Sequence, residues 1–154
     1  MFSKKAYAKC LIYTSLYSTC RKAIRRCDLK ISVLVKEPGK PSEAREIENT
    51  LEAFQTIVGG HIEALRIRDD LCCYVNEEGK LLNMQPNFVI RRQYVSKVDI
   101  IVGPAVFFRL DDEGSEVSLT LTDSLYLTRL LLDCDASNFI LNGRPLSELR
   151  EGVK

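Results

Sequence analysis

Residues 49–82 read NTLEAFQTIVGGHIEALRIRDDLCCYVNEEGKLL and contain the clearest change of hydrophobic period in the chain. Asn49 or Thr50 can cap a helix here, because a short side-chain oxygen accepts a hydrogen bond from an N–H of the first turn. The apolar residues that follow have helical spacing and share one face: Leu51, Phe54, Ile57 and Val58. We therefore expect a helix over residues 49–58, with this face lying on a sheet.

Two glycines end this predicted helix. Gly59 and Gly60 follow its last apolar residue, and glycine adopts the left-handed backbone that often closes a helix without a steric penalty. Residues 62–67 and 71–75 are then typical of strands, and Asp69-Asp70 between them is a turn signal. The stretch predicts a helix lying on a β-hairpin, the smallest unit of this chain able to start a core.

Two further strands are expected before the helix. Residues 31–35 form a β-branched run that is typical of a buried strand. Residues 37–42 contain two prolines and a glycine, which favour a turn. Residues 43–48 predict a weaker second strand, with Ala44 and Ile47 pointing inward.

Three strand segments are expected after the hairpin. A short one covers residues 80–83, and a longer one, residues 99–109, is the most hydrophobic segment of the body. Gly103 and Pro104 split the longer segment, because proline donates no ladder hydrogen bond and glycine suits a bulge. Residues 117–121 alternate apolar and polar side chains, as a half-buried strand does.

A last helix is expected over residues 123–133, capped by Thr122 or Asp123. Its inward face would carry Leu127, Leu130 and Leu131. Together the elements predict an α+β fold with a small, mostly antiparallel sheet and the helix of residues 49–58 packed on one face. Residues 29–133 would form this single domain, and residues 134–154 a loosely attached tail.

The N-terminal segment differs sharply from this body in charge. Residues 1–27 carry seven basic residues and no acidic one, whereas the remainder holds 15 basic and 21 acidic residues. Apolar residues in the segment recur at heptad-like spacing, so residues 1–28 predict a basic amphipathic helix attached to the domain. Such an arm suits a partner helix, a membrane surface or a nucleic-acid phosphate. The abrupt change of charge also leaves open that it is upstream sequence outside the native protein, in which case no nucleic-acid role is expected.

Composition places the chain among ordinary globular proteins, with 45% apolar and 28% charged residues. No apolar run approaches the roughly 20 residues needed to span a bilayer, so no membrane span is expected. Six cysteines occur without a C-x-x-C pair, and the chain has one histidine. Free thiols in a reducing cytoplasm are the interpretation we favour, with no metal site and no cofactor.

No catalytic set emerges from the sequence, so we expect a protein that is not an enzyme. His61, the single histidine, has no carboxylate and nucleophile nominated beside it. Glu77 and Glu78 are consecutive in a predicted turn and should diverge rather than act as an acid/base pair. Neither glycine-rich phosphate-binding motif occurs in the chain.

A few residues remain as candidates for a ligand site or a structural turn. Asparagine amides donate and accept hydrogen bonds together, which suits ligand contacts. The candidate ligand-binding residues are Gly60, Asn76, Lys80 and Asn87. The expected turn and cap residues are Asn49, Gly59, Gly60, Gly79, Gly103 and Pro104.

Four blocks of the chain resemble one protein family. They are KISVLVKEPGKP, EIENTLEAFQTIVGGHIEAL, YVNEEGKLLNMQPN and DIIVGPAVFF, and they occur in the order of the family. Over about residues 30–125 the chain resembles the family of domain of unknown function 3846, found in bacteria, their phages and mobile elements. The resemblance implies a small cytosolic α+β protein and supplies no reaction or substrate. The chain departs from the family pattern in its basic arm, at Pro104 and after Cys134.

Two classes of function stay open on this basis. The first, which we favour, is a non-enzymatic interaction or accessory protein of a phage or mobile element that binds another protein. The second is a module that binds or sequesters a small ligand or nucleotide through Gly60, Asn76, Lys80 and Asn87.

Overall fold

The structure is a computed structural model that describes residues 30–91, 98–135, 140–141 and 144–145. In chain order the elements are β1 (Lys30–Lys36), β2 (Glu43–Glu48), α2 (Leu51–Val58), β3 (Ile62–Arg68), β4 (Leu71–Asn76), β5 (Pro86–Arg91), β6 (Val98–Val102), β7 (Ala105–Leu110), β8 (Glu116–Val117), α3 (Leu121–Asp133), β9 (Ile140–Leu141) and β10 (Arg144–Pro145). The basic arm predicted for residues 1–28 lies outside the described residues.

The main sheet is antiparallel and has the strand order β2-β1-β7-β4-β3, with β8 paired to β7. Its two hairpins, β1–β2 and the predicted β3–β4, are separated by β7, which comes later in the sequence. Two further antiparallel pairs, β5–β6 and β9–β10, stand apart from this sheet. The predicted α+β class with a mostly antiparallel sheet is therefore confirmed.

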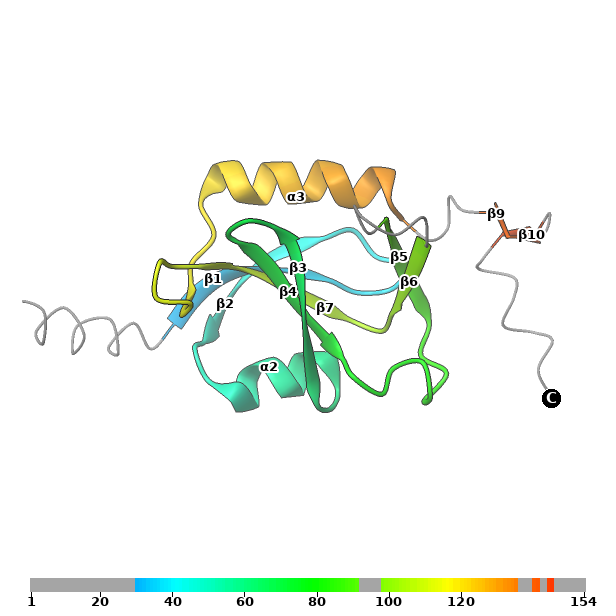
Figure 1. The fold of residues 1–154 in the computed structure, drawn as a ribbon, viewed down its shortest axis with the longest axis horizontal. Helices are drawn as coiled ribbons and strands as arrows, with labels where there is room; N and C mark the ends of the chain where they lie inside the picture. Colours follow the sequence, from blue (N-terminus) through cyan, green and yellow to red (C-terminus); the bar gives the residue numbers. More distant parts are fainter. Residues whose placement is uncertain (1–29, 92–97, 136–139, 142–143, 146–154) are drawn as a thin grey trace, which may run out of the picture.

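The two helices lie on opposite faces of the main sheet, so the domain has three layers (Figure 1). Helix α2 packs on the hairpin that follows it, as predicted, and α3 covers the other face. Both faces of the central strands are consequently buried, which explains why β1, β4 and β7 are almost continuously apolar.

Strand alternation divides the buried side chains between two cores. Cys72 and Cys73 show the principle, because consecutive strand residues point to opposite faces, and each of the two lies in a different core. The core under α2 contains Ile31, Val33, Val35, Phe54, Val58, Cys72, Val106 and Phe108. The core under α3 contains Leu34, Leu65, Leu71, Cys73, Val75, Phe88, Ile101, Ala105, Phe107, Leu119, Leu127 and Leu131. Each large buried side chain contributes about 1.5–3 kcal/mol, so each core adds substantially to stability.

Helix α2 begins and ends at predicted residues. The Thr50 side chain accepts a hydrogen bond from the Ala53 N–H at 3.2 Å, and Gly59 closes the helix with a φ of 77°. Asn49, the alternative cap, instead donates from its amide to the Glu116 carbonyl. Leu51 was expected to face the sheet and is 52% exposed. That prediction is wrong, because helical side chains tilt toward the N-terminus and Leu51 is the first helical residue.

The inward position predicted for Ala44 is also wrong. Ala44 is exposed, whereas Ile47 packs against the core under α2. The two residues are three positions apart in a strand, so their side chains must lie on opposite faces.

Gly103 and Pro104 separate two strands of different sheets rather than bending one strand. β6 pairs with β5, whereas β7 enters the main sheet between β1 and β4. Gly103 has a φ of 74°, and a Cβ at this position would lie 2.6 Å from the Met84 sulfur. The predicted split is confirmed. The chain passes from one sheet to the other at this point, and Gly103 leaves room for the Met84 side chain.

One predicted strand is replaced by a turn, and another is shorter than predicted. Residues 80–83 lie in the turn that contains Gly79, not in a strand. The strand expected over 117–121 stops at Val117, and Leu121 is the first residue of α3.

Helix α3 begins with a capping box, which differs from the predicted caps. Thr120, not Thr122 or Asp123, is the N-cap, and its hydroxyl accepts from the Asp123 N–H at 3.1 Å. The Asp123 carboxylate in turn accepts from the Thr120 N–H at 3.1 Å. This reciprocal pair starts the helix two residues earlier than predicted. As expected, Leu127 and Leu131 are buried, and Leu130 is half-buried.

The chain leaving α3 is held by β5. The Val89 N–H donates to the Cys134 carbonyl at 2.8 Å, and Phe88 forms a bridge with Asp135. Beyond this point β9 pairs with β10, and most of the predicted tail lies outside the described residues.

Candidate functional site

Two of the predicted ligand residues, Gly60 and Asn76, lie together at the end of α2. The Asn76 amide donates to the carbonyls of Val58 and Gly59 at 3.3 and 3.1 Å, and its oxygen accepts from the Glu78 N–H at 2.8 Å. A Cβ on Gly60 would lie 2.7 Å from the Asn76 amide nitrogen. Asn76 therefore joins the C-terminus of α2 to the turn after β4, and this requires a residue without a side chain at position 60.

Asn87 lies apart from that pair, beneath the β1–β2 turn. Its amide donates to the carbonyls of Lys36 and Gly103, both at 2.8 Å, and the residue is 1% exposed. No group among the described residues donates to its side-chain oxygen. A buried amide oxygen usually accepts a hydrogen bond, so this atom is suited to an N–H or O–H donor.

The fourth residue, Lys80, is on the surface of the turn after β4. Its ammonium pairs with the Asp99 carboxylate of β6 at 2.5 Å, and its side chain is largely exposed. The four predicted residues thus tether separate loops, and the cleft shown by the structure is lined by other residues.

Lys36 is an unexpected feature beside Asn87, because it is a lysine only 2% exposed. Its ammonium donates to the carbonyls of Glu37 and Lys40 at 3.2 and 2.7 Å and pairs with Asp135 at 2.9 Å. A buried charge is tolerated when it is paired and hydrogen-bonded in this way. Lys36 therefore fastens the β1–β2 turn to the chain that leaves α3.

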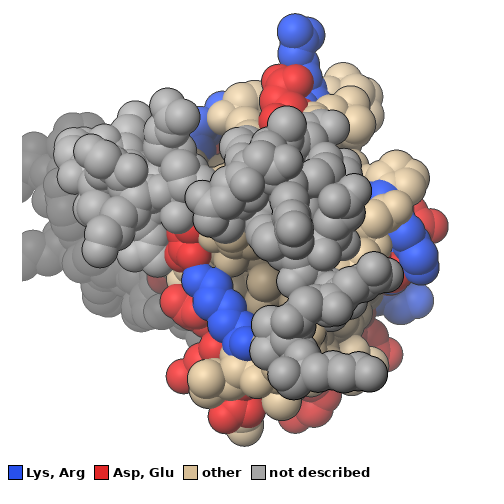
Figure 2. All heavy atoms as spheres, turned by 90° about the vertical axis from the view of Figure 1, so that its right-hand side faces the viewer, with Lys and Arg blue, Asp and Glu red and all other residues tan. Residues whose placement is uncertain are grey.

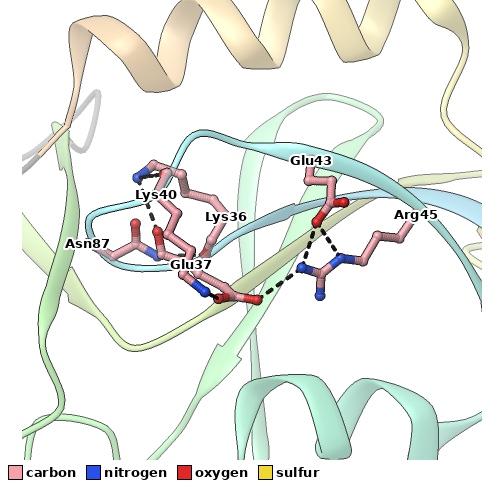
Figure 3. A network of polar contacts seen from close by, with 6 residues as sticks. All are labelled: Lys36, Glu37, Lys40, Glu43, Arg45 and Asn87. Carbon is pink, nitrogen blue, oxygen red and sulfur yellow. Dashed lines mark hydrogen bonds and ion pairs between the residues drawn. The ribbon is translucent and has the colours of Figure 1, made fainter.

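An ion-pair network continues from that turn onto β2, and Figure 3 shows its arrangement. Lys40 and Arg45 both contact the Glu37 carboxylate, at 2.6 and 3.0 Å, and Arg45 also contacts Glu43 at 2.7 Å. The hydrogen bonds from Lys40 and then Arg45 hold the pKa of Glu37 below its usual value. This network fixes the shape of the exposed turn opposite the C-terminal half of α3.

A cleft of about 290 Å³ lies between this turn and α3. Gly39, Lys40, Pro41 and Ser42 form one wall with the aliphatic part of Lys36, and Thr128, Leu131, Leu132 and Asp135 form the other. Its chemistry is mixed, because leucine and proline surfaces meet two hydroxyls and the ion pair of the buried Lys36 with the half-buried Asp135.

The outer side of α3 is the most apolar exposed feature of the described helices. Leu121, Leu125 and Leu132 are 78%, 64% and 64% exposed. None of the described segments lies on this side of the helix (Figure 1). Leu132 also lines the cleft. We call the exposed leucines Leu121, Leu125 and Leu132 together with this cleft the α3 outer face.

Burial changes the pKa of several titratable groups among the described residues. Burial raises the pKa of the Cys72, Cys73 and Cys134 thiols, which keeps them protonated near neutral pH. Burial, with a hydrogen bond to Glu116, also raises the pKa of the Tyr74 hydroxyl. His61 is exposed at the start of β3. No cluster of His, Cys, Asp or Glu able to hold a metal ion occurs in the described part of the chain.

Charge is mixed on the end of the domain seen in Figure 2. Basic side chains there lie beside acidic ones, and acidic side chains gather toward the lower edge, the side of α2 in Figure 1. This pattern differs from the continuous basic surface typical of nucleic-acid binding. Within the described ranges, no helix is long and apolar enough to cross a membrane.

The fold and these surfaces define a small three-layer α+β domain with an apolar outer helix face. A family model, Domain of unknown function (DUF3846), matches residues 31–131, and the chain belongs to this family. The match runs from β1 to Leu131 of α3, so it includes both cores and confirms the resemblance found in the sequence. No curated protein and no solved structure matches the chain.

The α3 outer face was missed because Leu121 was assigned to a strand. A usable signal was present, since Leu121, Leu125, Thr128 and Leu132 recur at helical spacing once Thr120 is taken as the cap. The burial of Lys36 had no comparable local signal, because its partner Asp135 is distant in the sequence.

Proposed function

We propose that the chain is a non-enzymatic protein-interaction module that binds through the α3 outer face. The observation that carries the proposal is the row of exposed leucines, Leu121, Leu125 and Leu132, on a helix that already buries Leu127 and Leu131. Single exposed leucines are common on proteins, but contiguous apolar patches often mark interaction sites. A helix with apolar residues on both sides is expected to be covered on both sides.

The setting we propose is that of an accessory protein of a phage or mobile element, acting in the cytoplasm. The family resemblance supports the phage setting, and the free thiols of Cys72, Cys73 and Cys134 support a reducing compartment. The nucleic-acid alternative depends on the arm of residues 1–28 and gains no support from the charges of the described end.

The proposal is tested by affinity capture with the full chain from a lysate of its natural host. Leu125→Glu places a charge in the centre of the α3 outer face, and Leu81→Glu makes the same change at the 83% exposed Leu81, outside that face. A stoichiometric partner should be retained by the wild type and Leu81→Glu and lost from Leu125→Glu, with thermal melts confirming that all three fold. If the wild type neither retains a partner nor associates with itself, the proposal is wrong.

A second candidate, binding of a small ligand or nucleotide, is favoured by one observation. The buried oxygen of Asn87 accepts no hydrogen bond from the described residues, and the amide of the same residue donates to the backbone carbonyl of Lys36, whose ammonium pairs with Asp135. A ligand with an N–H or O–H donor would satisfy it. Thermal-shift screening against nucleotides tests this, since a ligand at 100 times its dissociation constant adds about 2.7 kcal/mol of stability. Absence of any shift across the screen would count against nucleotides, and Asn87→Ala should abolish a shift that depends on this oxygen.

A further inference from the structure

The described residues cover only part of the sheet face beneath α3. The core under α3 takes side chains from β1, β3, β4 and β7 of the main sheet and none from β2. Ile47 of β2 packs on the α2 side. The alternate residues of this strand therefore lie on the α3 side, and all three are exposed. We call these residues the β2 strip: Ala44, Glu46 and Glu48.

The exposed leucines of α3 face the side on which β2 lies. The hydroxyl of Ser42, the residue before β2, donates to the Thr128 hydroxyl of α3 at 3.4 Å. At about 100° per residue, Leu121, Leu125 and Leu132 lie within about 60° of Thr128 and of one another around the helix axis. The row of these four residues and the β2 strip thus meet in a corner, and the cleft lies at one end of it. An element lying in this corner would contact both the helix and the sheet.

The chain enters the domain at the other end of the corner. β1 begins at Lys30, which pairs with Glu48, the last residue of β2. Two residues later, the Ser32 carbonyl accepts from the Leu119 N–H at 2.9 Å, just before the cap of α3. The arm of residues 1–28 is thus attached between the start of α3 and the end of β2.

The arm is long enough to cover the corner. A helix of 28 residues is about 40 Å long. The 6 residues of β2 span about 20 Å, and the 13 residues of α3 also span about 20 Å. An arm that runs back antiparallel to β1 therefore extends along the whole β2 strip and past the cleft.

The apolar residues of the arm match the spacing of the α3 row. The residues of that row are separated by four, three and four positions, and the same separations occur in the arm at Tyr13, Tyr17, Cys20 and Ile24. Helices with rows of this spacing pack side by side. The spacing is the same in both directions, so the arm matches α3 while running antiparallel to it.

We propose that residues 1–28 dock as a helix in the corner between α3 and the β2 strip, antiparallel to α3. The inference goes beyond the proposed function, because it names what covers the α3 outer face in the free chain. In this register each apolar residue of the arm faces one residue of the α3 row: Ile24 faces Leu121, Cys20 faces Leu125, Tyr17 faces Thr128, and Tyr13 faces Leu132 beside the cleft.

The charges of the two surfaces are complementary in this register. A strand advances about 3.3 Å per residue and a helix about 1.5 Å, so the last turns of the arm run over Glu46 and Glu48. These turns carry four basic residues, Arg21, Lys22, Arg25 and Arg26. Residues 10–20 carry no charge, and they lie over Ala44 and the leucines. Arg129, the single basic residue of α3, comes beside this uncharged part, so like charges do not meet.

Covalent attachment favours the arm over a separate helix of the same kind. A short connection to the site gives an effective concentration in the millimolar range, so a contact too small to hold a separate chain is sufficient here. A partner of the α3 outer face would have to displace the arm. Both cores form without the arm, so the arm should detach at a lower urea concentration than the one that unfolds the domain.

A disulfide between the arm and α3 tests the register. The purified full chain with Leu125→Cys is oxidised mildly at low concentration, and the linked peptides are identified by mass spectrometry. The native Cys20 should join the thiol introduced at position 125 at least about tenfold more often than the thiol of Leu81→Cys, which lies outside the corner. Cys20→Ser in the Leu125→Cys chain should remove this link, and the wild type sets the background of native cysteines.

Limited trypsin digestion of the full chain tests the two walls of the corner, because cleavage of the arm follows the population of its detached state. Leu125→Asn on the α3 wall should speed cleavage of the arm several-fold, whereas Leu81→Asn should not. Glu46→Lys, which reverses a charge of the β2 strip, should also speed cleavage. Its matched control is Glu63→Lys at an exposed carboxylate of β3, the opposite edge strand. Thermal melts show whether each variant domain is folded.

Two results would overturn the inference. One is a Cys20 link that is no more frequent with Leu125→Cys than with Leu81→Cys, and the other is arm cleavage that changes with neither Leu125→Asn nor Glu46→Lys. Failure of the proposed function is a separate result, because affinity capture would then yield no partner while the Cys20 link and the protection of the arm persist.

Discussion

The two helices pack on the same sheet and yet differ in what they leave to solvent. Helix α2 buries Phe54 and Val58 and exposes mainly polar residues, with Leu51 as the exception at its first position. Helix α3 buries Leu127 and Leu131 but exposes three leucines on its other side. The apolar residues of α2 are thus accounted for by the core beneath it. Those of α3 exceed what its core requires, and we assign the excess to binding.

The two helices also differ in how their end residues are held in place. Thr50 gives α2 a single cap bond, and Gly59 terminates it in the left-handed conformation. The start of α3 is joined to the sheet through Asp123, which approaches Arg109 of β7 at 3.4 Å and Arg68 of β3 at 3.9 Å. A helix that binds a partner on one side benefits from such an attachment on the other, because the binding surface then has a fixed position.

Phe54→Ala should have the largest effect on stability, because α2 is held by an aromatic cluster. The centroid of the Phe54 ring lies 5.0 Å from that of the Tyr74 ring and 5.7 Å from that of the Phe108 ring. Its removal should cost about 3–5 kcal/mol in the free energy of unfolding, measured by urea denaturation. Leu51→Ala on the same helix should cost less than about 0.5 kcal/mol. Similar losses for the two variants would show that α2 does not pack as described.

A comparison of Leu127→Ala with Leu125→Ala tests whether the two sides of α3 contribute differently to stability. Leu127 is fully buried, so its truncation should cost about 2–5 kcal/mol, whereas Leu125→Ala should change stability by less than about 0.5 kcal/mol. Urea denaturation at low protein concentration provides the measurement. A large loss for Leu125→Ala in the monomer would mean that the outer leucines serve the core, and the contrast with α2 would disappear.

Much of this arrangement was predictable from local patterns. The helix over Phe54 and Val58, the glycine stop at Gly59 and the strands around Cys72 and Cys73 follow from hydrophobic period alone, because each element depends on residues close in sequence. The same local logic failed at Leu121. This residue continues the strand-like alternation of Val117 and Leu119, and it also begins the helical row of α3.

The candidate surfaces were less predictable, since they depend on distant residues. One hydrogen bond joins Asn87 to Lys36 across 51 positions, and the Lys36 charge is paired with Asp135 of a segment after α3. Asn76 was predicted as a ligand contact because its amide can donate and accept. The structure shows that backbone carbonyls at the end of α2 use the donor and that the Glu78 N–H uses the acceptor. An amide gives the same signal in a sequence whether it serves a ligand or a turn.

Asp123→Asn tests the attachment of α3 to the sheet through the pH dependence of stability. Burial opposes ionisation of Asp123, but the hydrogen bonds from Thr120 and the charges of Arg109 and Arg68 outweigh it, and the pKa is lowered. The unfolded chain then binds this proton at a higher pH than the folded chain. The stabilisation is therefore complete above the unfolded pKa of about 3.9 and is lost as pH falls through the folded pKa.

We expect Asp123→Asn to lose about 1–3 kcal/mol at pH 7 and to show a shallower decline in stability below about pH 4 than the wild type. Urea denaturation in a series of buffers measures both. Asp112→Asn, at an exposed carboxylate of the turn before β8, is the matched control and should follow the wild type. Parallel curves for Asp123→Asn and the wild type would show that this carboxylate does not link α3 to the sheet.

The smallest expected difference lies between the two N-caps. Thr50→Ala removes one hydrogen bond, from the Ala53 N–H, and should cost about 0.5–1 kcal/mol. Thr120→Ala removes the bond from the Asp123 N–H and the hydroxyl's own bond to the Asp123 carboxylate at 2.6 Å, so its cost should be about 1–2 kcal/mol. The order matters more than the values, because both are threonine caps truncated in the same way. If Thr50→Ala were the more costly, the reciprocal bonds at the start of α3 would add nothing to stability. The firmer attachment of α3 would then have to come from its buried side chains alone.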